Sequence, residues 1–105
     1  MIAKESILLK IKRLVEEQEP EATLILYGSF ARGDNNADSD LDLLILLDKD
    51  NLTINDENRI KYPLFDLEFD TGQIISPLVF SKKDWESRHK ITPFYENVER
   101  EGIVL

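Results

Sequence analysis

Cysteine is absent from this sequence, and its absence excludes both disulfide bonds and thiolate metal sites. Long apolar runs are absent as well, so no segment is expected to span a membrane. The first residues lack the pattern of a signal peptide. We therefore expect a cytoplasmic protein that has no membrane partner.

Basic residues are in the minority, because 13 Lys and Arg stand against 21 Asp and Glu and give a formal net charge of −8. Nucleic-acid binding relies on clustered Lys and Arg, so we expect no nucleic-acid partner. A single nucleotide is still compatible with this charge, since a divalent cation can reverse the local field.

The length of 105 residues predicts one small domain, residues 1–105, with a single modest core. Such a chain leaves no room for a separate substrate domain. If a reaction partner needs a second binding surface, another chain or a homodimer must supply it. The sequence contains no internal repeat, low-complexity tract or linker.

Apolar spacing in the first half of the chain predicts one helix and two strands. An apolar stripe indicates a helix from Lys4 to Gln18, which Pro20 ends. The short apolar run from Thr23 to Tyr27 is typical of a central strand. Alternation from Asp40 to Leu47 predicts a second strand, with Asp40 and Asp42 on the same face.

The second half of the chain contains one ambiguous segment, residues 54–70. Residues 65–70 alternate as a strand does, whereas the length of the whole segment and the spacing of its leucines favour a helix that ends at Thr71-Gly72. Pro63 is an awkward residue inside such a helix. We also expect a third strand over 73–80, helices over 82–88 (capped by Ser81) and 93–101, and an extended piece over 103–105.

Two polar motifs lie between and at the start of the expected strands. Residues 28–34 are Gly-Ser-Phe-Ala-Arg-Gly-Asp, and residues 39–43 are Ser-Asp-Leu-Asp-Leu. If strands 24–27 and 41–47 pair antiparallel, the end of the first lies beside the start of the second. The Gly-Ser corner and the two aspartates would then meet at one edge of the sheet.

The first motif has the chemistry of a phosphate site. Gly28 has no Cβ, so a phosphate can approach its backbone closely. Ser29 offers a hydroxyl and a backbone N–H, and a helical turn from Ser29 to Arg32, stopped by Gly33, would point further N–H groups at an anion. Arg32 can bind a phosphate through charge-assisted hydrogen bonds.

The second motif has the chemistry of a metal site. Asp40 and Asp42 are two residues apart on a strand, so their carboxylates point the same way. Such a pair can hold Mg²⁺, which prefers oxygen ligands and usually keeps substrate phosphate in its shell. We therefore expect a site for a nucleoside triphosphate and Mg²⁺ or Mn²⁺, with Asp40 and Asp42 as catalytic metal ligands and Gly28, Ser29 and Arg32 as nucleotide-binding residues.

The pattern Gly-Ser-x-Ala-Arg-Gly at 28–33, followed by Ser-Asp-x-Asp-Leu at 39–43, resembles the signature of the polymerase-beta-type nucleotidyltransferase superfamily, in its minimal, single-domain branch. The resemblance implies an α/β (α+β) fold with a small mixed sheet and flanking helices. It also implies Mg²⁺-dependent transfer of a nucleoside monophosphate from a nucleoside triphosphate. By match, Gly28 and Ser29 would bind triphosphate, and Asp40 and Asp42 would hold metal.

The sequence departs from this family at the third carboxylate, which normally lies on the next strand between apolar residues. If residues 73–80 form that strand, the matching residue is Ser76, and a serine hydroxyl is a poor metal ligand and no base near neutral pH. If residues 65–69 form the strand instead, Asp66 or Glu68 can fill the role. The absence of a third carboxylate puts catalysis in question but leaves nucleotide binding intact.

Three functions follow from these observations. The first is a nucleotidyltransferase that acts on a protein or a small molecule. The second is a nucleotide-binding module that turns over weakly or not at all and regulates a helical partner, since minimal nucleotidyltransferases resemble the antitoxin half of toxin–antitoxin pairs with a helical HEPN-type partner. The third is a structural domain without a ligand.

Overall fold

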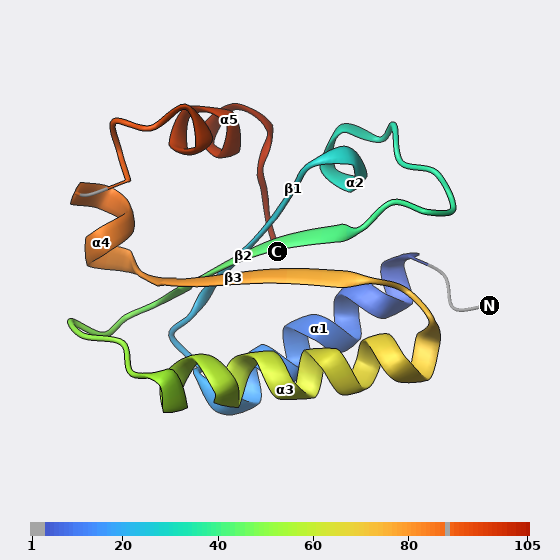
Figure 1. Ribbon diagram of the computed structural model, residues 1–105, viewed down its shortest axis with the longest axis horizontal. Coiled ribbons are helices and arrows are strands. Elements are labelled where there is room, and N and C mark those ends of the chain that lie inside the picture. Colours follow the sequence, from blue (N-terminus) through green and yellow to red (C-terminus); the bar gives the residue numbers. More distant parts are fainter. Residues whose placement is uncertain (1–3, 88) are drawn as a thin grey trace.

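A four-stranded sheet lies between two layers of helices in the computed structural model, which describes residues 4–87 and 89–105 (Figure 1). In chain order the elements are α1 (Lys4–Gln18), β1 (Thr23–Tyr27), α2 (Ser29–Arg32), β2 (Leu41–Leu47), α3 (Ile54–Thr71), β3 (Ile75–Ser81), α4 (Lys82–Ser87), α5 (Pro93–Glu101) and β4 (Ile103–Val104). The expected end of the α4 helix at Arg88 lies outside the described residues. No helix in the described part of the chain is long and apolar enough to cross a membrane.

The strands form one mixed sheet in the order β3-β2-β1-β4. β1 is antiparallel to both β2 and β4, whereas β2 and β3 are parallel. Parallel neighbours need a crossover connection, and α3 supplies it. The mixed sheet with flanking helices is therefore confirmed, and so is the α/β class.

β2 alternates its side chains between two apolar cores, which explains why its sequence is almost continuously apolar. Leu41, Leu43 and Ile45 face the core shared with α1 and α3. Leu44 and Leu46 face a second core that contains Trp85 of α4 and Val98 of α5. By alternation, Asp42 lies on this second face. It is near the start of β2, and this end of the strand is not buried by α4 and α5.

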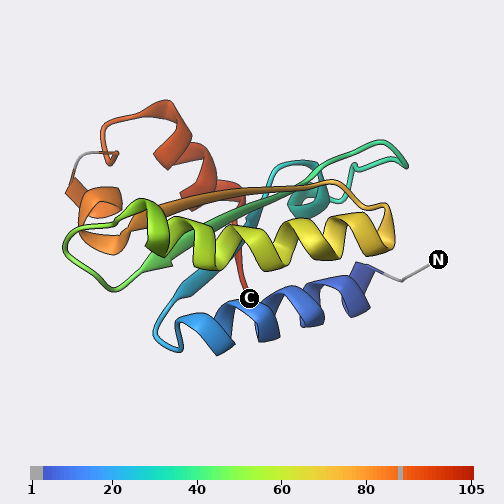
Figure 2. The ribbon, with the colours of Figure 1, turned by 60° about the horizontal axis from the view of Figure 1, so that its bottom comes forward.

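Helices α1 and α3 lie side by side beneath the sheet (Figure 2). The ambiguous segment is a helix, because Ile60, Leu64 and Leu67 recur at helical spacing and bury against the sheet. Thr53 begins the helix with a capping box, and Gly72 ends it with φ +76°. Pro63 lies inside the helix, where the burial of this apolar face outweighs the backbone hydrogen bond that proline cannot donate.

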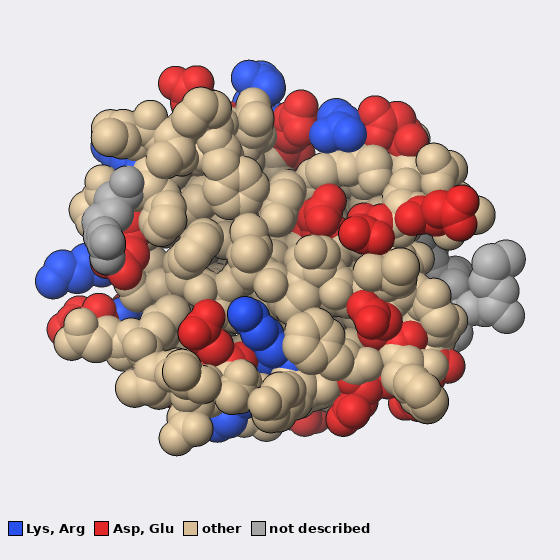
Figure 3. Space-filling model, viewed as in Figure 1, with Lys and Arg blue, Asp and Glu red and all other residues tan. Residues whose placement is uncertain are grey.

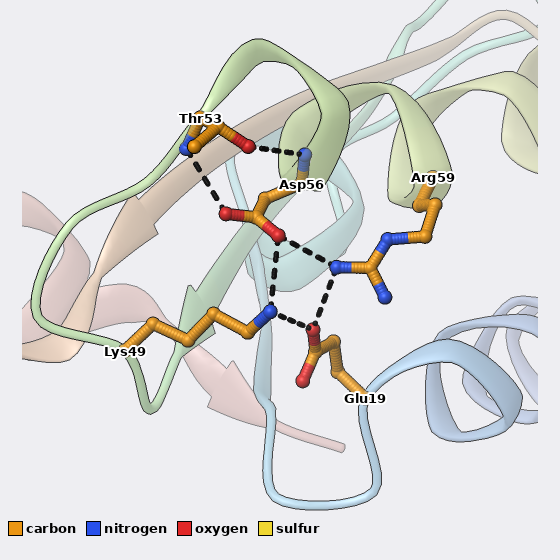
Figure 4. A network of polar contacts seen from close by, with 5 residues as sticks. All are labelled: Glu19, Lys49, Thr53, Asp56 and Arg59. Carbon is orange, nitrogen blue, oxygen red and sulfur yellow. Dashed lines mark hydrogen bonds and ion pairs between the residues drawn. The ribbon is translucent and has the colours of Figure 1, made fainter.

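A four-residue ion cluster joins the N-terminus of α3 to the two preceding turns (Figure 4). Asp56 Oδ1 accepts hydrogen bonds from Lys49 Nζ at 3.0 Å and from an Arg59 guanidinium nitrogen at 2.6 Å. Glu19 pairs with the same two cations at 3.0 and 3.2 Å. The cluster fixes the end of α1, the turn after β2 and the first turn of α3 relative to one another.

Candidate functional site

The site is built where β1 ends and β2 begins. Tyr27, the last residue of β1, is the register partner of Asp42, the second residue of β2. The antiparallel pairing that the sequence predicts is therefore confirmed. Because Gly28 follows Tyr27 directly, the Gly-Ser corner lies beside the aspartate motif.

Gly28 is in close contact with Asp42, and its backbone explains why glycine occupies this position. Its φ of +75° and ψ of −155° belong to a region that side chains rarely allow. A Cβ added to Gly28 would collide with a carboxylate oxygen of Asp42 and would lie 3.2 Å from Asp42 Cγ. The corner and the carboxylate can be this close only because Gly28 has no side chain.

The corner continues into α2, the short helical turn that the sequence predicts. Ser29 is its first residue, and the Ser29 carbonyl accepts the backbone N–H groups of Gly33 and Asp34 at 2.9 and 3.1 Å. Gly33 ends the turn in the left-handed conformation, with φ +82°. The Ser29 hydroxyl is half-buried at the corner and hydrogen-bonds to no described residue, so it is available to a ligand.

Arg32 lies near the corner but is already paired. Its Nε donates to Asp34 at 3.1 Å, and a terminal guanidinium nitrogen donates to Glu101 of α5 at 3.2 Å. The guanidinium still acts on Asp42 through its positive charge. Binding a phosphate would require Arg32 to exchange one of these carboxylates for the ligand.

Asp40 and Asp42 form a pair of interacting carboxylates. Asp40 is exposed, whereas Asp42 is half-buried. Burial raises the pKa of Asp42, the negative charge of Asp40 raises it further, and Arg32 opposes the shift. A cation bound between the two carboxylates would relieve their mutual repulsion. Their oxygen ligands suit Mg²⁺ or Mn²⁺.

Acidic side chains also predominate on the surface around the pair, over α2, the loop after it and the start of β2 (Figure 3). A nucleoside triphosphate carries several negative charges of its own. It would meet repulsion here unless a cation compensated these acids. The charge of this surface therefore agrees with the metal requirement that the aspartate pair indicates.

Ser76 is the residue that the family resemblance places at the position of the third carboxylate. It is the register partner of Asp42 in the parallel β2–β3 pair, and it lies on the same face of the sheet. The alternative that placed Asp66 or Glu68 there required a strand over residues 65–69, and that strand is wrong because these residues lie in α3 on the other face. Glu68 instead accepts the backbone N–H of Ile75 at 2.7 Å. Among the described residues, no group of three His, Cys, Asp or Glu could hold a metal.

A cavity of about 230 Å³ opens beside the corner, between β1 and α5. Its walls are Tyr27, Gly28, Arg32, Phe94, Asn97, Val98 and Glu101. Burial, with a smaller contribution from the charge of Asp42, raises the pKa of Tyr27 to about 12, so its hydroxyl stays protonated well above neutral pH. The walls of this cavity combine aromatic, amide and charged side chains next to the Gly-Ser corner.

The α5 side of this cavity was not predicted from the sequence. Phe94, Asn97, Val98 and Glu101 recur with the spacing of one helical face, which was the signal available. Nothing local indicates that this face meets Arg32, which precedes Glu101 by 69 residues.

Comparisons with known proteins indicate a family and a fold. Residues 8–99 match a family described as "Nucleotidyltransferase domain". A Methanocaldococcus jannaschii protein named "Putative protein adenylyltransferase" is 34% identical over 82 residues, which are 76% of this chain and 74% of that protein. A crystal structure of a toxin–antitoxin with AMP-PNP has a similar fold, with a TM-score of 0.62 and 18% identity over 97% of this chain and 72% of that one.

Proposed function

This chain belongs to the nucleotidyltransferase domain family, and from that premise we propose that it transfers a nucleoside monophosphate from a nucleoside triphosphate to an acceptor. The observation that carries the proposal is the contact between Gly28 and Asp42, which brings a phosphate-binding corner against the aspartate pair. The relative named as a protein adenylyltransferase favours ATP as the donor and a protein as the acceptor. A small-molecule acceptor is the other possibility that the family allows.

The triphosphate would bind at the corner. Gly28 allows its oxygens to approach the backbone, and Ser29 offers a hydroxyl and an N–H. Arg32 would leave Glu101 and pair with a phosphate, because a charge-assisted bond to a phosphate replaces one to a carboxylate at little cost. The nucleoside would extend toward the cavity that Tyr27 and Phe94 line.

Asp40 and Asp42 would hold Mg²⁺ or Mn²⁺. When bound, the ion neutralises charge on the phosphates and polarises the phosphorus–oxygen bonds. Asp42 is suited to this task because its carboxylate lies next to the corner where the phosphates would be.

In the transfer itself, an acceptor oxygen forms a bond to the α-phosphorus while the bond from that phosphorus to the bridging oxygen breaks. Pyrophosphate leaves with the electron pair of the broken bond. The acceptor proton passes to solvent, since Ser76 is not a base near neutral pH. The lack of a base beside Asp42 predicts slow turnover.

Incubation of the chain with α-labelled ATP, Mg²⁺ or Mn²⁺, and candidate acceptors tests this proposal. We expect label transfer by the wild type and none by the Asp40→Asn, Asp42→Asn double variant. An Asp38→Asn variant is the matched control, because Asp38 is exposed in the loop that precedes this pair. If the wild type transfers no label from any nucleoside triphosphate, the catalytic proposal fails.

A second candidate is a nucleotide-binding antitoxin that regulates a helical partner and has little or no activity. Ser76 in place of a carboxylate favours it, and so does the fold likeness to a toxin–antitoxin structure. Calorimetry with AMP-PNP and Mg²⁺ separates the candidates. Nucleotide binding without label transfer supports the antitoxin, whereas label transfer by the isolated chain contradicts an inactive module.

A further inference from the structure

The outer face of α3 carries large side chains that the fold leaves in solvent. Tyr62, Phe65 and Phe69 are 59%, 42% and 90% exposed, and Ile54 at the start of the helix is 74% exposed. Their spacing places them on one face of the helix, together with Asn55 and Asn58. We call this set of six residues the outer α3 face.

This face is uncharged in a chain in which 32% of the residues are charged. It lies opposite the buried face of Ile60, Leu64 and Leu67, so α3 is apolar on two sides. A helix on a protein surface ordinarily has charged or polar residues facing solvent. Exposed apolar patches of this kind mark protein–protein contact sites, in which Tyr and Phe are enriched.

The N-terminal half of the outer α3 face is hollowed. A cavity of about 560 Å³ lies between α3 and the end of α1, and it is lined by Gln18, Asn55, Asn58, Arg59, Tyr62 and Pro63. A hollow beside exposed aromatic rings can receive a side chain of a docked protein, which gives the contact a defined register.

The charges beside this face indicate what kind of protein it binds. Asp66 and Asp70 are exposed and make no ion pair with any described residue. The cations of α3 itself are already engaged, since Arg59 pairs with Asp56 and Glu19, and Lys61 lies 3.6 Å from Glu57. The free charge is therefore acidic, and a basic partner complements it. A second copy of this chain, with its own net charge of −8, does not.

The C-terminal end of α3 approaches the aspartate pair. After the helix, Gln73 donates its side-chain amide to the Ser39 carbonyl at 3.0 Å, and Leu41 donates its N–H to Ile74 at 2.8 Å. Figure 1 shows this end of α3 on the same side of the molecule as the loop before β2. A protein bound along α3 would thus end at the edge of the sheet that carries Asp40 and Asp42.

We propose that the outer α3 face binds a basic amphipathic helix of the acceptor protein, a role that rests on the nucleotidyl transfer proposed above. The apolar side of that helix covers Tyr62, Phe65 and Phe69. Its Lys or Arg side chains pair with Asp66 and Asp70. Binding holds the acceptor protein at the edge of the sheet where β2 begins, on the face opposite Asp42.

The probe is a labelled 18-residue peptide that forms an amphipathic helix, with Leu along one face and Lys at the flanks of that face (the Lys peptide). The control peptide has the same sequence with every Lys replaced by Glu. We expect the Lys peptide to bind the full chain in fluorescence anisotropy and to shift the amide resonances of α3. Phe69→Ser should weaken binding roughly tenfold, as loss of an aromatic contact does at a protein interface. Ile91→Ser is the matched control, since Ile91 is 91% exposed and lies between α4 and α5.

A charge test complements this one. Asp66→Lys with Asp70→Lys should abolish the preference for the Lys peptide, whereas Asp50→Lys, on the exposed turn before α3, should not. Equal binding of both peptides, resonance shifts away from α3, or no binding overturns the proposal. If the wild type sediments as a dimer and Phe69→Ser sediments as a monomer, the outer α3 face binds a second copy of this chain, and the proposal is wrong. Phe69→Ser should leave ATP binding unchanged, so a failure of the nucleotide site is detected separately.

Discussion

Asp42 and Ser76 are register partners on neighbouring parallel strands, and both lie on the face of the sheet that α4 and α5 cover only in part. A carboxylate at position 76 would therefore lie directly beside the aspartate pair. In this chain the position holds a hydroxyl, so the pair keeps its metal-binding chemistry but has no adjacent base.

Ser76→Asp should increase label transfer from α-labelled ATP, because it restores a third carboxylate beside Asp42. Without metal, the same change should lower the free energy of unfolding, since a third negative charge joins two that already repel one another. Mg²⁺ should reverse this destabilisation in a thermal-shift measurement. Leu78→Asp is the control, because Leu78 is the next residue on the same face of β3 and pairs with Leu44. Equal activity of the two variants would contradict the role assigned to position 76.

Gly28→Ala should destabilise the chain and abolish nucleotide binding. The methyl group meets the Asp42 carboxylate, and the backbone conformation is one that alanine adopts only under strain. We expect a loss of about 3 kcal/mol in chemical denaturation, the sum of strain and collision. Gly33→Ala should cost only about 1–2 kcal/mol, because φ is also positive there but no atom lies within 4 Å of the added methyl group.

Glu101→Gln should tighten nucleotide binding. Glu101 holds the Arg32 guanidinium at 3.2 Å, and this exposed ion pair must break before Arg32 can bind a phosphate. Exposed pairs contribute about 0.2–1 kcal/mol, so calorimetry should detect an affinity gain of up to about fivefold. Glu99→Gln, on the same helix but without a contact to Arg32, should leave the affinity unchanged. A weaker affinity in Glu101→Gln would mean that Glu101 itself contacts the nucleotide.

Asp56→Asn should remove an acid-sensitive part of the stability. The backbone N–H of Thr53 holds the pKa of Asp56 well below its ordinary value, and Lys49 and Arg59 add to this effect. Because the folded-state pKa is the lower one, the carboxylate stabilises the fold above about pH 4, and this contribution is lost as the pH falls below that value. The free energy of unfolding can be measured at intervals of about one pH unit between pH 6 and pH 3. It should fall less steeply with falling pH in Asp56→Asn than in the wild type. Asp50→Asn is the control variant, because Asp50 is exposed on the preceding turn and makes no ion pair with a described residue.

Local sequence patterns predicted most of the fold because most of its elements are specified locally. The bounds of α1, β1 and α5 agree with those expected from the sequence, and α1 ends before Pro20 as predicted. The segment 54–71 was ambiguous because its residues alternate over a short stretch. Its leucine spacing favoured a helix, which is confirmed, and this helix also supplies the crossover that the parallel strands β2 and β3 need. The third strand begins at Ile75 rather than Gln73, since the Gln73 side chain bonds to Ser39 and Ile74 instead.

The sequence also located one side of the site but not the other. Gly28, Ser29, Asp40 and Asp42 lie within 15 residues, so a single hairpin-like pairing of two strands was enough to bring them together. The α5 wall depends on a contact between Arg32 and Glu101 that no short-range pattern contains. The outer α3 face was concealed for a different reason. Its aromatic residues are interspersed with those of the buried face, and composition alone does not separate the two.

The middle position of β2, between β1 and β3 and between two cores, has a kinetic consequence for the aspartate pair. Its backbone is hydrogen-bonded on both sides, and its side chains contribute to both apolar clusters. Local opening of β2 would expose both cores at once, so its amide protons should exchange with deuterium only when the whole molecule unfolds. Asp42 is thus held by the segment expected to exchange most slowly, while Ser29 and Arg32 lie on a four-residue helical turn outside the sheet.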